Sequence, residues 1–350
     1  MRTIITTVGT SLLMNAKRDV GVERLDEQQL ANYLRHTEAA RVSAETNSLS
    51  RLLQSDERII FLCSQTDDGR RCAGALAQHY KNASHDTCMV EIPDLTYVES
   101  RFKMRGLRSL VATLIEQIRR ERGQGHTVLI NATGGFKAEI AYATLVGLLF
   151  DVPVYYMHEA FREIIEMPPT PISWDYSLLA NYEEFFEWID ADLRATVEVD
   201  TRLRGLPENI RLLLAEEEGW TMLSPAGEVF YGAYRDRLQR TEDVPILLSM
   251  QALDTYRSTA PEVRRVFDRA FAKLRLPELR ASGADRVRNS DCLVYPKGHR
   301  EERLFFFEAE DGGVRICEVS RHSDQSYERL IDRGVRRRDY GDFQKWPGQG

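Results

Sequence analysis

Short apolar runs alternate with helix-patterned segments through the first half of this chain. The runs are rich in β-branched residues, as expected for strands that are buried on both faces of a parallel sheet. Because the segments between them have helical apolar spacing, the alternation predicts βαβ units and a doubly wound, mostly parallel α/β sheet. The predicted strands are 2–8, 58–64, 87–92, 127–130 and 153–158, and the predicted helices are 24–41 with a continuation at 43–53, 70–82, 102–122 and 136–150.

Two of these strands end in turns of small and polar residues. The strand at 127–130 leads into residues 131–137, which contain Gly134-Gly135 and end in Lys137, and the strand at 2–8 leads into Gly9-Thr10-Ser11. Glycines allow backbone N–H groups to approach an anion, and a helix N-terminus carries partial positive charge. Ligands of open α/β sheets bind at the carboxyl ends of the strands, where the strand order reverses.

These turns predict a phosphate-binding crevice, although a tight turn without a ligand is the alternative for either corner alone. No P-loop and no G-x-G-x-x-G motif is present. The polar turn after the strand at 58–64 is a candidate third wall. The candidate ligand-binding residues are therefore Gly9, Thr10, Ser11, Ser64, Gln65, Thr66, Asn131, Thr133, Gly134, Gly135 and Lys137.

Three segments together, residues 7–12, 43–49 and 131–137, resemble the CARF domain. CARF domains are CRISPR-associated, Rossmann-like sensors of cyclic oligoadenylates. The resemblance covers residues 1–175 and implies a homodimer that binds a cyclic oligoadenylate across its two-fold axis, with cyclic tetra-adenylate as the expected ligand.

Composition limits the remaining classes of protein. The chain has 350 residues, of which 43% are hydrophobic, so there is room for two or three domains with real cores. No run of 18 uncharged apolar residues occurs, and the N-terminus enters a strand at once. We therefore expect a cytoplasmic protein with no membrane partner. The five cysteines lack C-x-x-C pairing, so neither a zinc site nor a disulfide framework is expected, and no cofactor is expected beyond the allosteric activator.

Charge is distributed unevenly along the chain. Residues 246–350 contain 20 Lys and Arg against 17 Asp and Glu, whereas the rest contains 27 against 37. A polyanionic partner is therefore expected to meet the C-terminal part.

Prolines at 168, 169 and 171 end the sheet domain, which predicts a boundary at 175 and a connector over 176–243. The connector is expected to have helices at 182–193, 210–217 and 227–238 with an extended segment at 219–223, and it resembles a winged helix. The helix at 227–238 has Arg235 and Arg237 against Glu228 and Asp236. DNA is therefore not expected as a partner, and a ligand-responsive transcription regulator is the alternative function.

Residues 244–350 have a different pattern, with a strand at 245–250, helices at 251–258 and 261–274, and strands at 291–295, 302–308 and 314–320. Asp311-Gly312-Gly313 predicts a hairpin turn between the last two strands. The result is an α+β unit.

Basic residues, with a tyrosine, lie at the ends and faces of these strands. RNA cleavage without metal needs a group that takes the 2′-OH proton, cations that stabilise the phosphorane, and an acid for the leaving oxygen. The alternative is that basic edge residues only prevent aggregation and that Tyr327 belongs to the core. The candidate catalytic residues are Lys297, His299, Arg300, Arg303, Arg321, His322 and Tyr327, with no metal ligands.

The order of elements, the residues 303–306 before the hairpin turn, and Val319-Ser320-Arg321 followed by Tyr327 resemble the RelE toxins. RelE toxins are mRNA interferases that cut mRNA on the ribosome, and their functional strand arginine, second arginine and tyrosine match Arg303, Arg321 and Tyr327. Val294 and Pro296 stand where the family has lysines, so Lys297, His299 and Arg300 are assigned in their place.

Together the resemblances imply a cyclic-oligoadenylate-activated, ribosome-dependent endoribonuclease of type III CRISPR antiviral defence. Attack by the 2′-OH would leave a 2′,3′-cyclic phosphate. A secondary possibility is ring-nuclease activity of the CARF crevice, in which Ser11 and Lys137 act on the bound ligand.

Overall fold

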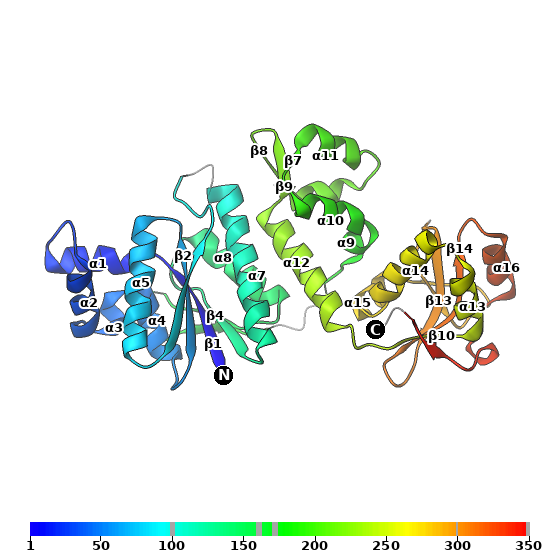
Figure 1. Cartoon of the computed structure of the whole chain (residues 1–350), viewed down its shortest axis with the longest axis horizontal. Helices are drawn as coiled ribbons and strands as arrows, with labels where there is room; N and C mark the ends of the chain where they lie inside the picture. Colours follow the sequence, from blue (N-terminus) through cyan, green and yellow to red (C-terminus); the bar gives the residue numbers. More distant parts are fainter. Residues whose placement is uncertain (99–101, 159–162, 170–173, 299, 348–350) are drawn as a thin grey trace. The chain divides into compact units, whose positions relative to one another are not determined.

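The computed structural model describes residues 1–98, 102–158, 163–169, 174–298 and 300–347 (Figure 1). The chain forms two compact units, with residues 1–171 and 187–233 in the first and residues 172–186 and 234–350 in the second. The division falls within helices α10 (Glu183–Ala191) and α12 (Pro225–Arg240). The three-domain division at 175 and 243 stays a prediction.

The first unit contains a six-stranded sheet with the order β3-β2-β1-β4-β5-β6. The first five strands in this order run parallel and β6 runs antiparallel to β5, which confirms the predicted mixed α/β fold with a mostly parallel sheet. The order reverses between β1 and β4, so the switch point lies between these two strands. The strands are β1 (Arg2–Val8), β2 (Arg58–Ser64), β3 (Asp86–Ile92), β4 (Thr127–Asn131), β5 (Val154–Tyr156) and β6 (Ile165–Met167).

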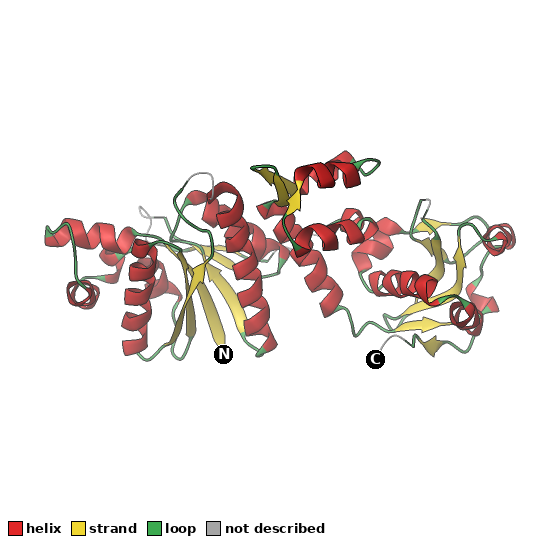
Figure 2. Ribbon diagram, turned by 45° about the horizontal axis from the view of Figure 1, so that its top comes forward, coloured by secondary structure: helices red, strands yellow, loops and turns green. Residues whose placement is uncertain are grey.

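Helices cover both faces of this sheet (Figure 2). On one face, Ile4 and Phe61 pack in a buried cluster with Leu12, Leu49 and Leu76 from three helices. On the other face lie the helices that follow β3 and β4. The helices and helical turns are α1 (Ser11–Val20), α2 (Glu27–His36), α3 (Ala39–Val42), α4 (Ala44–Leu52), α5 (Asp67–Asn82), the π-helical turn η1 (Phe102–Gly106), α7 (Leu107–Gly123) and α8 (Lys137–Leu149).

The region between β1 and β2 differs from the prediction. Helix α1 was not predicted, and the predicted helix at 24–41 with its continuation is three separate helices, α2 to α4. Asp26 and Ser43 each accept a hydrogen bond from the backbone N–H three residues on, so Asp26 begins α2, and Ser43 separates α4 from α3.

Residues 187–233 contain a three-stranded antiparallel sheet in the order β7-β9-β8. The predicted helix at 210–217 is wrong, because a 3₁₀ turn is followed there by strand β8. Glu218 and Gly219 have φ of 52° and 82°, so they form the two-residue turn of a β8–β9 hairpin. The winged-helix assignment stays a prediction. The elements are β7 (Arg194–Ala195), α11 (Thr196–Leu203), η2 (Glu208–Leu213), β8 (Leu214–Glu217) and β9 (Trp220–Leu223).

The second unit has a sheet with the order β11-β12-β13-β14-β10-β15. The predicted order of strand, two helices and three strands is present, and Gly312 turns the β13–β14 hairpin with φ of 78°. Strand β10 runs parallel to β14, and helices α15 and α16 were not predicted. The RelE-like assignment stays a prediction. The elements are α9 (Ser177–Asn181), β10 (Ile246–Leu248), α13 (Met250–Ser258), α14 (Pro261–Lys273), α15 (Pro277–Gly283), β11 (Asp285–Arg286), β12 (Leu293–Tyr295), β13 (Glu302–Glu308), β14 (Val314–Arg321), α16 (Gln325–Arg333), η3 (Arg337–Asp339) and β15 (Gln344–Lys345).

Across the described ranges, no helix is both long enough and apolar enough to cross a bilayer.

Candidate functional sites

The turns that follow β1 and β4 touch each other at the switch point of the first unit. The two strands pair in parallel, with Thr6 opposite Asn131. Thr7 Oγ1 donates a hydrogen bond of 2.6 Å to the carbonyl of Gly134. A Cβ atom added to Gly9 would lie only 2.8 Å from the backbone nitrogen of Gly135, so the two turns are in backbone contact. The structure thus brings the two predicted corners together.

A buried glutamate that was not among the predicted site residues occupies the first corner. The Gly9 backbone N–H donates to Glu45 Oε1 at 2.8 Å, and the Ser11 hydroxyl donates to Glu45 Oε2 at 3.3 Å. Glu45 itself is fully buried. The donors that were predicted to meet a phosphate are therefore bonded within the protein, and Thr10 between them is half-buried.

The second corner is braced by its own polar side chains. Asn131 is fully buried and donates from Nδ2 to Ser48 Oγ at 2.9 Å, and it accepts from Thr133 Oγ1 at 2.8 Å. Thr133 Oγ1 also accepts from the Met157 backbone N–H at 3.1 Å. These side chains hold the turn, whereas Lys137 at the start of α8 is exposed.

The polar residues of the predicted third wall also make hydrogen bonds within the protein. Thr66 Oγ1 accepts from the Gly69 backbone N–H at 3.0 Å and so caps α5, and it lies 2.9 Å from Ser64 Oγ. Gln65 Oε1 accepts from the Asp94 backbone N–H at 3.0 Å. These residues shape the wall, and the Gln65 side chain is the exposed one.

An aromatic patch that was not predicted stands beside the glycine turn. Phe136 is 50% exposed, and its ring lies 4.7 Å from the ring of Tyr97 and 5.5 Å from the ring of Phe102. Exposed rings next to a phosphate site can stack on bases. The sequence signal was an aromatic residue between Gly135 and Lys137.

Glu139 in the first turn of α8 is a second buried acid at this crevice. Burial raises its pKa to about 7, against a hydrogen bond from the Phe136 backbone that lowers it. Its Oε1 has no hydrogen-bond partner among the described residues. The carboxyl therefore keeps its proton to higher pH in the folded chain than in the unfolded chain.

This raised pKa predicts a pH dependence of stability. Between the usual value of 4.5 and about 7, the folded state holds a proton that the unfolded state has lost, so stability falls as pH rises and levels off above that window. The total loss is at most roughly 3 kcal/mol. Thermal unfolding across this pH window should show a smaller fall in stability for Glu139→Gln than for wild type. The control Glu116→Gln, on the exposed face of α7, should behave as wild type. An unchanged slope in Glu139→Gln would contradict the assignment.

In the second unit, the pairing of β13 with β14 separates the two matched arginines. Glu302 pairs with Arg321, and Arg303 pairs with Ser320. Because neighbouring strand residues point to opposite faces, Arg303 and Arg321 extend from opposite faces of the sheet.

Arg303 is 2% exposed and lies inside the unit. Its guanidinium donates to the carbonyls of Pro296 and Gly298, and its central carbon lies 5.6 Å from the centre of the Tyr327 ring. The ring of His322 lies 5.1 Å from the same tyrosine. The structure therefore brings Arg303, His322 and Tyr327 together. Arg303 is buried, so it contacts the tyrosine ring from inside the unit.

The other candidates have separate partners. An exposed Arg321 lies 3.5 Å from Glu301 Oε2, and Arg300 Nε lies 3.6 Å from Glu302 Oε1. Lys297 donates to the Ser282 carbonyl. His299 lies outside the described residues. The catalytic roles of all seven residues stay predictions.

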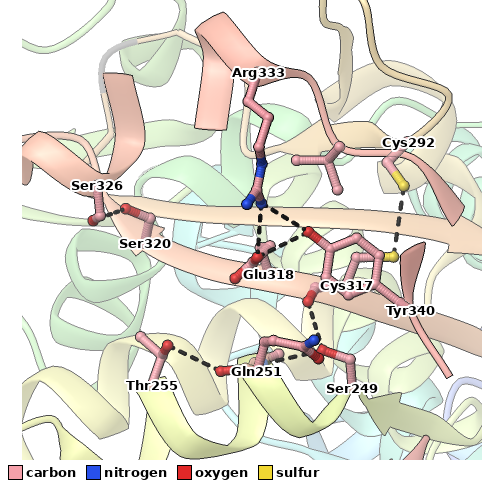
Figure 3. Close-up of polar contacts among 12 residues, drawn as sticks. Ser249, Gln251, Thr255, Cys292, Cys317, Glu318, Ser320, Ser326, Arg333 and Tyr340 are labelled. Atoms are coloured by element: carbon pink, nitrogen blue, oxygen red, sulfur yellow. Dashed lines mark hydrogen bonds and ion pairs between the residues drawn. The ribbon is translucent and has the colours of Figure 1, made fainter. Parts of the chain in front are cut away.

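Polar contacts hold β14 beneath α16 (Figure 3). Ser320 Oγ lies 3.0 Å from Ser326 Oγ, and Glu318 Oε1 accepts from Tyr340 at 2.8 Å and from Arg333 at 3.3 Å. These contacts fix the helix that carries Tyr327.

The N-terminal unit is similar to a CRISPR-associated family. The family described as "CRISPR-associated protein (Cas_APE2256)" matches residues 40–170. The matched segment includes β4, the Asn131 to Lys137 turn and the buried Glu45, and it covers well under half of the chain.

Two solved structures show weak similarity. Protein VC1899 from Vibrio cholerae is 11% identical, with 69% of this chain and 68% of that chain covered at a TM-score of 0.27. Can2 from Sulfobacillus thermosulfidooxidans, solved in complex with cyclic tetra-adenylate, is 10% identical, with 95% and 84% covered at a TM-score of 0.25. Neither score supports a conclusion about fold or ligand.

Proposed function

We propose that this chain is a ligand-gated ribonuclease of CRISPR defence, in which the first unit binds a cyclic oligoadenylate and the second unit cuts RNA. The observation that carries the proposal is the backbone contact between the turns after β1 and β4 at the switch point. The match of residues 40–170 to a CRISPR-associated family supports it.

Lys137 and the N-terminus of α8 supply the positive charge for a ligand phosphate. The exposed ring of Phe136 offers a surface on which an adenine stacks. The side chains of Glu45 and Glu139 lie beneath the two glycines and occupy the floor of the crevice, so they exclude a phosphate from it. The ligand therefore lies over the rim, and a homodimer with cyclic tetra-adenylate across its axis meets this requirement.

In the second unit, Arg321 binds and neutralises a substrate phosphate, because a guanidinium matches a phosphate bidentately. His322 and Tyr327 are the candidates for moving protons at the 2′-OH and the leaving oxygen. Arg303 positions Tyr327 and the segment before β13 through its two carbonyl contacts. The substrate is mRNA on the ribosome, and ligand binding shifts the population toward the active arrangement.

Titration calorimetry with cyclic tri-, tetra- and hexa-adenylate tests the sensor directly. We expect saturable binding of the tetra-adenylate at one ligand per two chains. Absence of binding by all three rings would contradict the proposed function, and ligand-dependent binding of promoter DNA would favour a transcription regulator instead.

Lys137→Ala is expected to weaken ligand binding by about 10-fold or more, since it removes a full charge next to the phosphate. The matched control is Lys81→Ala, an exposed lysine near the end of α5. Equal affinity of Lys137→Ala and wild type would place the phosphate elsewhere.

A further inference from the structure

A small cavity of about 250 Å³ lies next to Arg321 in the second unit. One side is apolar and comes from Val263, Val266 and Phe267 of α14, and Phe267 is 1% exposed. Val266 is 41% exposed, so this side of the cavity reaches the surface. The cavity is therefore an apolar slot that opens to solvent.

The remaining residues around the cavity are charged, and three of the four are acidic. These residues are Glu262, Glu301, Glu302 and Arg321, and because the lining surface itself is mostly apolar, their charged groups lie at the edge of the cavity. Glu302 and Arg321 are opposite each other on β13 and β14, so their side chains share the face that meets α14. Each strand end thus places one charged group at the cavity.

These carboxylates keep the capacity to accept hydrogen bonds. Glu302 is 9% exposed, and its contact with Arg300 Nε at 3.6 Å is longer than a hydrogen bond. Glu301 accepts from Ser323 Oγ at 2.9 Å, and this bond, with Arg321 nearby, lowers its pKa. An ionised carboxylate accepts about four hydrogen bonds, so acceptor positions remain for a ligand.

An apolar slot with acceptors at its edge selects a flat ligand that carries N–H donors. Among RNA bases, adenine, cytosine and guanine each have an exocyclic amino group. Uracil has none, and it has a carbonyl oxygen at the position of the cytosine amino group, as thymine does. A carboxylate attracts the amino group and repels the carbonyl oxygen. A phosphate is repelled by the three acids, yet Arg321 at the rim attracts it, so a base in the slot would leave its phosphate at the arginine.

We propose that this cavity holds one base of the RNA substrate beside Arg321 and that Glu302, with Glu301, selects bases with an amino group over uracil. The proposal rests on the proposed ribonuclease function and adds the feature of the RNA that the second unit recognises. It assigns base selection to Glu302 at the start of β13 and to Glu301 before it, which have no other role in the proposed reaction.

The test uses the full chain with ribosomes, cyclic tetra-adenylate and mRNAs that differ only by cytosine or uracil at each position around the cut. Wild type should cleave the cytosine-containing RNA at least about 10-fold faster than the uracil-containing one at a single position. Glu302→Gln should lose this preference, because a carboxamide both donates and accepts. Glu301→Gln on the exposed rim gives the same readout if the buried substitution alters folding, and Glu310→Gln on the hairpin is the control that keeps the preference.

Three outcomes would overturn the proposal. Equal rates for cytosine and uracil at every position in wild type would exclude a base-selecting cavity. A preference that survives in both glutamine variants would place selection elsewhere. If wild type cuts no RNA at all, the ribonuclease function itself fails, and the cavity proposal fails with it.

Discussion

Arg321→Ala is expected to lower ligand-activated RNA cleavage by about 100-fold or more, because it removes a cation that stabilises the phosphorane. The side chain is exposed at the end of β14, and its ion pair with Glu301 at 3.5 Å is weak enough for a phosphate to replace. Single-turnover cleavage of a ribosome-bound mRNA measures the effect.

The same variant should bind cyclic tetra-adenylate with wild-type affinity, since Arg321 and the crevice belong to different units. Arg329→Ala is the matched control, because it removes an exposed arginine from α16. Loss of ligand binding in Arg321→Ala would contradict separate sensor and effector sites, and wild-type cleavage would remove Arg321 from the active site.

Gly134→Ala is expected to abolish measurable ligand binding and to destabilise the first unit. The added Cβ would lie 2.1 Å from Glu45 Oε1 and 2.6 Å from the carbonyl of Thr7, so the turn has to move away from β1. Overpacking of this kind costs about 1–3 kcal/mol. Calorimetric titration and thermal unfolding measure the two effects separately.

Gly74→Ala is the control for this substitution. Gly74 lies within α5, and a Cβ there would meet nothing within 4 Å. The alanine should leave ligand binding unchanged and add up to about 1 kcal/mol of stability, because glycine is the poorer helix former. If Gly134→Ala binds ligand as well as Gly74→Ala does, the crevice is not the ligand site.

The sequence predicted the parallel sheet and the meeting of its two corners, because buried strands and glycine turns are local patterns. It did not predict that Glu45 would occupy the donors of Gly9 and Ser11. That contact joins residues 36 positions apart, and it depends on where α4 packs against the end of β1. Glu45 lies in the first turn of α4, where an acid is already favoured by the helix dipole, so its place in the segment 43–49 that resembles CARF domains did not indicate this contact.

In the β13–β14 hairpin of the second unit, the side-chain orientation could not be predicted from the sequence. Arg303 and Arg321 were predicted to act together, yet they extend from opposite faces of the sheet. A shift of register between Phe305 and Phe306 changes which residues of β14 face those of β13, and no local sequence pattern indicates where such a shift occurs. For the same reason the burial of Arg303 could not be read from its position on a strand.

The most direct test of the central claim is in vitro translation with and without cyclic tetra-adenylate, followed by mapping of the mRNA ends. We expect cuts that repeat with the codon period, that appear only when the ligand is added, and that disappear in Arg321→Ala. Equal cleavage with and without the ligand, or no cleavage in either case, would contradict a ligand-gated ribonuclease.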